Sequence, residues 1–244
     1  MELIKAIKKI FINEDKKSVN ITELEYFFGD YKIILKDKHM LAKYQESFPL
    51  YDRFLPILCA DFDGLIIDIG ANVGDTSIAI FSKNAKSFIV GVEPDTDFYD
   101  ECINNIKLNN LSERFFGIKK FVSTKTGNYS LEKSKTASTG SISYDSIQTG
   151  ENNTISFSQL MDLIPSEEKI KFDVLKIDTD GFDWDILNSF ISYNKDSRVK
   201  PKFIFFEMQT FLNNIGVKDI NRNHIIENYK LSIERLQNIG YNNF

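Results

Sequence analysis

The stretch LIIDIGANVGDTSIAIF, residues 65–81, decides the fold. It begins as a short apolar run without polar alternation, passes through a turn with two glycines, and continues with apolar residues at helical spacing. A buried strand that leads through such a turn into a helix is typical of a parallel sheet with helices on both faces. Because the chain beyond it repeats this alternation, we predict a doubly wound, Rossmann-like α/β fold.

Five apolar runs are predicted strands of one sheet, and four segments between them are predicted crossover helices. The strands are residues 65–69, 88–92, 115–122, 172–177 and 203–208, and the helices are 76–81, 95–108, 182–191 and 219–239. Residues 123–153, rich in Ser, Thr, Gly, Lys and Asn, interrupt this pattern. Strand signals at 128–131 and 141–144 predict a β-hairpin insertion, either a lid beside a ligand crevice or a plain surface hairpin.

Residues 1–60 are predicted to form an accessory region, and residues 61–244 the main domain. The accessory region is expected to hold a helix at its start, a strand at 31–35 and a helix at 49–59. Residues 1–11, MELIKAIKKIF, combine apolar residues at helical spacing with lysines. This segment is predicted to pack on its own domain or on a partner, with weak contact to an anionic membrane surface as the alternative.

The composition excludes several classes of protein. With 244 residues, 42% of them hydrophobic, the chain has enough apolar material for one main core. A net charge of −5 argues against a nucleic-acid partner. Two cysteines are too few for a disulfide framework, and no apolar run reaches the length of a membrane span. We therefore expect a cytoplasmic protein without an export signal.

The glycine turn is the first candidate ligand site. Gly70 and Gly74 allow a tight turn and close approach of a ligand, and the following helix start favours a carboxylate or phosphate. Asp68 repels anions but suits a ligand with a cationic amine beside its carboxylate, as in the methionine end of S-adenosylmethionine. The glycine spacing is not G-x-G-x-x-G, which disfavours a dinucleotide.

Glu93 ends the second predicted strand, in the sequence GVEP at 91–94. It follows the glycine turn by about 20 residues, the offset at which an acidic side chain accepts hydrogen bonds from ribose hydroxyls. We predict that it binds the nucleoside of the cofactor.

Carboxylates also follow the fourth and fifth predicted strands. Asp178 or Asp180 is predicted to act as general base for an acceptor hydroxyl, and Glu207 is a further candidate. Asp180 has capping of the next helix as its alternative role. The three acids could also bind a divalent ion, but we expect no metal. His39 and His224 lie outside these strand ends in the sequence, which argues against a histidine base.

Taken together, these residues resemble the FkbM family of S-adenosylmethionine-dependent methyltransferases. The resemblance runs from about Asp61 to Phe244. The matching motifs are IIDIGANVGDTS at 66–77, VGVEPD at 90–95, TASTGSIS at 136–143, ISFSQLMD at 155–162, DVLKIDTDGFDWDIL at 173–187 and FIFFEMQ at 203–209.

The resemblance implies a class I methyltransferase fold and transfer of a methyl group to a hydroxyl oxygen, often of a sugar, glycan or hydroxylated natural product. It carries cofactor binding onto five residues and an active-site role onto Asp178. The five are Asp68, Gly70, Asn72, Gly74 and Glu93. A methyltransferase-like binding or scaffold domain within a larger glycan-assembly protein is the alternative.

Two features depart from the family pattern. Asp180 and Asp183 stand where the family usually has Glu, one methylene longer. The family sheet ends in a hairpin of two more strands, whereas the chain stops at Phe244. We therefore expect a longer native chain, or a covering of the last strand by another chain, as in a homo-oligomer, or by residues 1–60.

Overall fold

The computed structural model describes most of the chain. The described residues are 23–36, 39–47, 53–125, 127–133, 140–145, 153–179, 182–195, 199–206 and 222–243. The amphipathic segment 1–11, with its expected packing or membrane contact, lies outside them. So do two of the candidate acids, Asp180 and Glu207.

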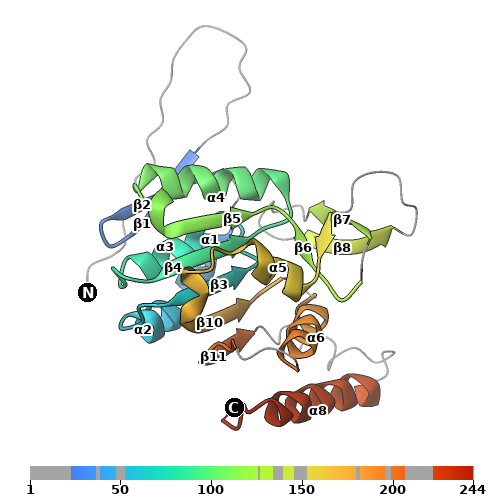
Figure 1. The fold of residues 1–244 in the computed structure, drawn as a ribbon. Coiled ribbons are helices and arrows are strands. Elements are labelled where there is room, and N and C mark those ends of the chain that lie inside the picture. Colours follow the sequence, from blue (N-terminus) through green and yellow to red (C-terminus); the bar gives the residue numbers. More distant parts are fainter. Residues whose placement is uncertain are drawn as a thin grey trace, which may run out of the picture.

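The centre of the molecule is a parallel sheet of five strands in the order β11-β10-β3-β4-β5 (Figure 1). The strands are β3 (Leu65–Ile69), β4 (Phe88–Val92), β5 (Phe115–Ile118), β10 (Phe172–Ile177) and β11 (Phe203–Phe206). The chain builds outward from β3 to β5 on one side, then returns to build β10 and β11 on the other. The predicted doubly wound fold is confirmed, and its strand order reverses between β3 and β10.

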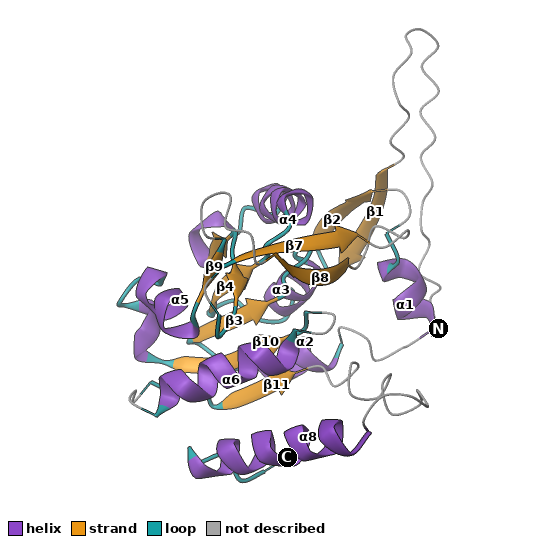
Figure 2. Ribbon diagram, turned by 90° about the vertical axis from the view of Figure 1, so that its right-hand side faces the viewer, coloured by secondary structure: helices purple, strands orange, loops and turns teal. Residues whose placement is uncertain are grey.

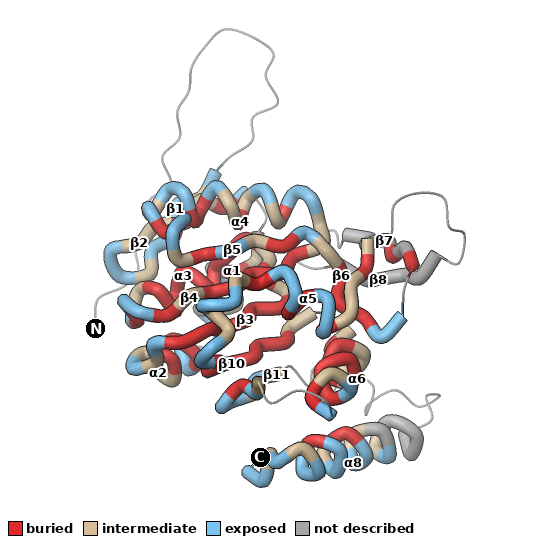
Figure 3. The backbone as a smooth tube through the Cα atoms, viewed as in Figure 1, coloured by how far each residue is buried: buried red, intermediate tan, exposed pale blue. Residues whose placement is uncertain are grey.

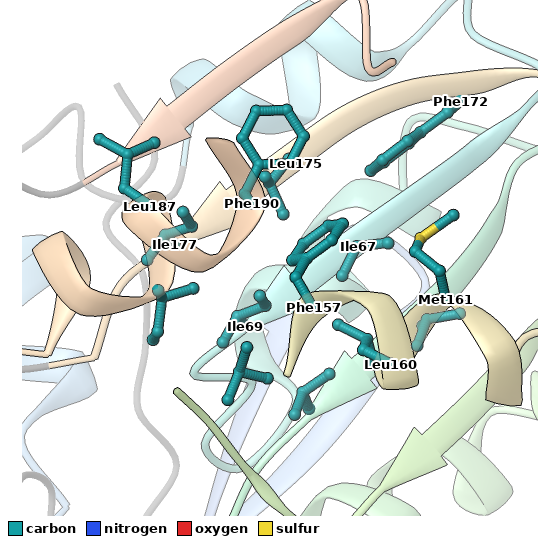
Figure 4. Close-up of a cluster of buried hydrophobic side chains, with 14 of the residues drawn as sticks. Ile67, Ile69, Phe157, Leu160, Met161, Phe172, Leu175, Ile177, Leu187 and Phe190 are labelled. Carbon is teal, nitrogen blue, oxygen red and sulfur yellow. The ribbon is translucent and has the colours of Figure 1, made fainter. Parts of the chain in front are cut away.

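Helices cover both faces of this sheet (Figure 2). Because side chains alternate along a strand, Leu65, Ile67 and Ile69 of β3 enter one core and Ile66 enters the other. The first core packs against α5 (Phe157–Leu163), α6 (Asp183–Asn194) and α8 (Arg222–Asn238), and part of it is drawn in Figure 4. The second packs against α3 (Asp75–Phe81) and α4 (Thr96–Leu108). The four predicted crossover helices are therefore present, with ends shifted by a few residues.

The predicted strand 115–122 is wrong as a single element. It divides into β5 and the short β6 (Phe121–Val122), which leaves the central sheet and pairs in parallel with β9 (Thr154–Ile155). Between the two strands lie Lys119 and Lys120, which provide no apolar side chains to continue the buried strand. Two short 3-10 turns, Ser112–Arg114 and Glu168–Ile170, lead into β5 and β10.

The N-terminal part packs into the second core. It contains β1 (Glu23–Phe28), β2 (Tyr31–Lys36), α1 (Leu41–Ser47) and α2 (Phe54–Cys59). The predicted strand at 31–35 is confirmed as β2, and the predicted helix at 49–59 is confirmed from residue 54 onward. The hairpin β1–β2 and α1 were not predicted. Buried side chains from all of these elements share a core with α3 and α4. Figure 3 colours the chain by how far each residue is buried.

The insertion after β6 contains the predicted hairpin, β7 (Asn128–Lys133) paired antiparallel with β8 (Gly140–Asp145). It lies on the right-hand side of Figure 1. Whether it acts as a lid stays a prediction.

Strand β11 is the outer strand on its side of the described sheet. The ring of Phe62 stacks on Phe203, and Phe54 packs against Phe205, so the region around α2 contacts one face of β11. Both strand residues stay partly exposed, at 44% and 39%. The expected covering of this edge by further chain stays a prediction. Among the described helices, none is long and apolar enough to cross a membrane.

Candidate functional site

The turn between β3 and α3 is closed mainly by backbone hydrogen bonds. The N–H groups of Gly70 and Ala71 both donate to the carbonyl of Val92 on β4, at 2.9 and 3.1 Å. Gly70, Asn72 and Gly74 have positive φ angles of 84°, 48° and 83°. Such angles favour glycine, and asparagine tolerates them better than most residues. The turn that follows β3 is therefore hydrogen-bonded to the last residue of the neighbouring strand β4.

Gly70 leaves no room for a side chain. A Cβ atom built on it would lie 1.7 Å from the carbonyl oxygen of Asp178, which follows β10. The N–H of Asp178 in turn donates to the carbonyl of Ile69 at 3.0 Å. The structure thus brings the glycine turn into backbone contact with Asp178 at the point where the strand order reverses. This is the position at which doubly wound sheets bind ligands.

Glu93 lies directly beside this turn. Its Oε2 accepts the N–H of Asn72 and its Oε1 accepts the N–H of Asp95, both at 2.9 Å. Burial raises the pKa of Glu93 to about 7, even though the two backbone hydrogen bonds act to lower it. An ionised carboxylate has about four acceptor positions, so two remain for a ligand. Glu93 is thus placed and equipped to accept two hydrogen bonds.

Asp68 lies behind the turn and is fully buried. Its Oδ2 accepts the hydroxyl of Ser77 on α3 at 2.7 Å, and its Oδ1 accepts Lys176 Nζ at 2.8 Å. Both carboxylate oxygens therefore have partners within the protein. The expected contact of Asp68 with a cationic ligand amine stays a prediction, and this geometry gives it a supporting position instead.

Lys176 connects the two sides of the site, and sequence reasoning missed it. Besides Asp68, its ammonium group donates to the carbonyl of Gly70 at 3.2 Å and lies 3.5 Å from Asp178 Oδ2. Burial acts to lower the pKa of Lys176, but the two aspartates outweigh it and hold the pKa well above the usual value. The lysine is a buried cation that joins β3, its turn and the end of β10.

A sequence signal for this ion pair did exist. Asp68 and Lys176 are the penultimate residues of two apolar runs, LIIDI and FDVLKI. The strands lie side by side in parallel, and their register places Asp68 opposite Lys176. Because a charge inside a fully buried strand needs a partner, two opposite charges at equal distances from the strand ends predict a pair.

Asp178 is the candidate base that the structure describes. Its side chain is 35% exposed, in contrast to the buried Lys176 beside it. Within the described segments, no three His, Cys, Asp or Glu side chains come together as metal ligands would. Because Asp180 and Glu207 lie outside those segments, the predicted metal-free site stays a prediction.

The turn after β10 is held by side chains. The N–H and hydroxyl of Thr179 both donate to Asp183 Oδ1, at 3.0 and 3.3 Å. Asp183 is the first residue of α6. The N-cap of this helix is Phe182, which makes no capping hydrogen bond through its side chain. The described bonds of Asp183 therefore brace the turn.

The base of the hairpin insertion adjoins this second turn. Asp185 on α6 accepts hydrogen bonds from the hydroxyl of Ser123, at 2.7 Å, and from the N–H and hydroxyl of Thr124. The ring of Tyr129 meets Phe182 edge to face at 5.0 Å. The start of the hairpin therefore contacts Phe182, which follows the candidate base Asp178 by four residues in the sequence.

His39 lies outside the strand ends in the sequence but close to the site in the fold. Its Nε2 is 3.4 Å from Asn72 Oδ1 on the first turn, and the expectation that no histidine acts as base stays a prediction. A residue of the N-terminal part thus contacts the glycine turn. The sequence offered no signal for this contact, because a chain separation of more than thirty residues carries no spacing rule.

Comparisons with known proteins identify the family of the chain. The sequence pattern described as the methyltransferase FkbM domain matches residues 68–241. No curated protein matches the chain. The fold is similar to three solved methyltransferases, all at low sequence identity.

The first is the O-methyltransferase TomG from Streptomyces achromogenes, solved with SAM, at 12% identity and a TM-score of 0.48, covering 81% of this chain and 75% of that one. The second is an O-methyltransferase from Bacillus cereus, solved with SAH, at 18% identity and a TM-score of 0.45, covering 75% and 68%. The third is the SAH-bound methyltransferase PaMTH1 from Podospora anserina, at 11% identity and a TM-score of 0.44, covering 84% and 77%.

Proposed function

The chain belongs to the FkbM methyltransferase domain family and has a class I methyltransferase-like fold. From this premise we propose its cofactor and the atom that accepts the methyl group. The cofactor is S-adenosylmethionine, and the acceptor is a hydroxyl oxygen of a saccharide, glycan or other hydroxylated metabolite. The observation that carries the proposal is the meeting of the glycine turn, Glu93 and Asp178 at the strand-order reversal.

The residues present fit the cofactor. Glu93 has acceptor positions left after its two backbone bonds, which suits the neighbouring hydroxyls of a ribose. Gly70 and Gly74 allow the positive φ angles that shape the turn, and each packs closely on other parts of the protein, Gly70 on Asp178 and Gly74 on Cys102. Asp68 and Lys176 support the turn from behind, so in this proposal Asp68 acts through the turn rather than by direct contact.

When bound, S-adenosylmethionine supplies a methyl group on a positively charged sulfur. Asp178, at the same edge and partly exposed, is placed to receive an acceptor hydroxyl. In the transfer the hydroxyl oxygen would take the methyl carbon, the sulfur–methyl bond would break to leave neutral S-adenosylhomocysteine, and the carboxylate of Asp178 would accept the hydroxyl proton. General base catalysis of this kind contributes about a hundredfold to ten-thousandfold, and positioning contributes further.

The choice of acceptor class rests on the family and on Asp178. Aromatic rings at the start of α6 do not add to it. Trp184 meets Phe206 and Tyr229 edge to face, at 5.6 and 5.8 Å. These rings pack on one another next to the core, so they give no evidence of a sugar-stacking surface.

The first test is calorimetric titration of the protein with S-adenosylmethionine and S-adenosylhomocysteine, with NAD as the control ligand. Binding of the first two and not of NAD is expected. No binding at millimolar cofactor would contradict the proposal and favour the scaffold alternative.

The second test concerns the acceptor atom. Extract fractions of small metabolites and of glycans are incubated with the protein and with cofactor labelled in its methyl group. The expected product gains one CH2 in mass and keeps its label in mild alkali, as a methyl ether does. Label that alkali releases as methanol, or label on nitrogen, would exclude a hydroxyl acceptor.

A further inference from the structure

We infer that His39, which precedes the segment matched by the family pattern, is a positioning residue for the cofactor turn and acts through the side chain of Asn72. The inference rests on the proposed binding of S-adenosylmethionine. It assigns to the N-terminal part of the chain a role in that binding.

The hydrogen bonds of the His39 ring define which nitrogen donates. Its Nδ1 accepts the N–H of Leu41 at 3.3 Å, and therefore carries no proton in the neutral ring. The proton of the neutral imidazole is then on Nε2, the atom that lies 3.4 Å from Asn72 Oδ1. His39 thus donates to the turn while its other nitrogen is fixed to the start of α1.

Asn72 is a sensitive point of the turn. Its φ angle of 48° lies in the left-handed region, where a non-glycine residue needs support from its surroundings. Its backbone N–H donates to Glu93 Oε2. A bond that holds the Asn72 side chain therefore also holds the N–H that orients Glu93.

The N-terminal part contacts the same turn at a second point. Asn105 on α4 accepts the N–H of Ile34 on β2 at 2.8 Å and donates to the carbonyl of Val73 at 3.0 Å. One asparagine thus bridges β2 and the residue that follows Asn72. His39 directly, and β2 through Asn105, thus connect the N-terminal part to two neighbouring residues of the turn.

Loss of the His39 bond is expected to lower cofactor affinity, because fewer molecules would hold the turn in the conformation that binds the cofactor. When only a fraction of the molecules has the binding conformation, the apparent dissociation constant rises by the inverse of that fraction. A single neutral hydrogen bond corresponds to a factor of about three to ten. The direct contacts of the cofactor remain as before.

The test compares three His39 variants, which differ in the hydrogen bond of the imidazole ring that they can still make. His39→Gln keeps a donor near the Nε2 position, His39→Asn keeps an acceptor near Nδ1, and His39→Leu keeps neither. Calorimetry with S-adenosylmethionine is expected to show His39→Gln within about twofold of the wild type. The other two variants are expected to bind about three to ten times more weakly. Thermal unfolding of each variant separates this effect from a loss of the fold.

A double-mutant cycle identifies the partner. Asn72→Gly removes the acceptor and keeps the left-handed backbone accessible. In that background His39→Leu is expected to have no further effect on affinity. Equal losses in all three single variants, no loss in any, or an unchanged effect in the Asn72→Gly background would each overturn the inference. A wild-type protein that binds no cofactor would instead refute the proposed function, and the inference with it.

Discussion

The turn after β3 and the turn after β10 lie in contact at the centre of the sheet, yet different kinds of bond hold them. In the first, the backbone groups of Gly70 and Ala71 donate to Val92, and the side chains of Glu93 and Lys176 bond to further backbone groups of the turn. The second is braced by side chains, with Thr179 donating to Asp183. Backbone bonds fix a shape that depends on allowed φ angles, whereas side-chain bonds also place charge. In the proposed function the first turn binds the cofactor and the second supplies the general base.

Lys176 should give the largest effect, because it serves both turns. Lys176→Met leaves Asp68 buried without its cation, which we expect to lower the free energy of unfolding by about 3 to 5 kcal/mol. The matched control is Lys171→Met, whose ion pair with Asp63 is exposed and should change stability by less than about 1 kcal/mol. Urea denaturation measures both. Equal effects would show that burial of the pair does not matter.

Gly70 tests the backbone-built turn. Gly70→Ala forces a Cβ against the carbonyl of Asp178 and strains a positive φ. We expect the free energy of unfolding to fall by about 2 to 4 kcal/mol and cofactor binding to be lost. Gly29→Ala is the control: its φ is also positive, at 58°, but the nearest atom to the new Cβ is 3.9 Å away. It should lose only about 1 kcal/mol. A similar loss in both variants would remove the turn-to-turn contact from the argument.

Asp178 tests the side-chain-built turn. Asp178→Asn should lower methyl transfer about a hundredfold, because the proton acceptor is lost. Cofactor affinity should stay within a few fold, because the side chain keeps its shape and Lys176 keeps its closer partner Asp68. Asp162→Asn, an exposed acid on α5, is the control. The measurement is the initial rate of label transfer into the fraction that the wild-type protein labels. Full activity of Asp178→Asn would move the role of base to Asp180 or Glu207.

Glu93 should give a smaller effect that depends on pH. Burial raises its pKa from 4.5 to about 7, so the cofactor-free protein keeps this carboxyl protonated in a range where the unfolded chain has lost the proton. The contribution to stability is therefore present at low pH and is lost as the pH rises through about 7. Cofactor binding has the opposite sign, because the ionised form is the stronger acceptor for ribose hydroxyls.

Calorimetry of the wild type should accordingly show affinity for S-adenosylmethionine rising about tenfold between about pH 6 and pH 8. Glu93→Gln keeps the shape of the side chain and cannot ionise. The variant should bind more weakly at the higher pH, and the part of the pH dependence due to Glu93 should disappear. An identical profile in wild type and variant would exclude Glu93 as the titrating group.

The sequence predicted the parts that follow local rules. The runs 65–69, 88–92 and 172–177 became strands with those bounds, because short and mainly apolar runs without polar alternation are typical of buried parallel strands. The hairpin β1–β2 also had a signal, the two-residue Gly29-Asp30 turn between β-forming runs, that was overlooked.

Other features could not be predicted from local signals alone. The contact of His39 with Asn72 depends on how the N-terminal part packs against α3 and α4, which no spacing rule gives. The charges of Asp68 and Lys176 near the ends of two apolar runs were a signal that each needs a partner, but pairing them with each other also required the strand order, because only adjacent strands place the two opposite each other. Periodicity identifies elements, whereas the site arises from the order in which they are assembled.

The base of the hairpin joins two points that lie far apart in the chain. Asn153 accepts the N–H of Tyr129 at 2.9 Å and donates to its carbonyl at 2.7 Å. The entropic cost of closing a loop grows only slowly with its length. The anchoring of the hairpin β7–β8 at this asparagine therefore depends little on the length of the chain that it closes.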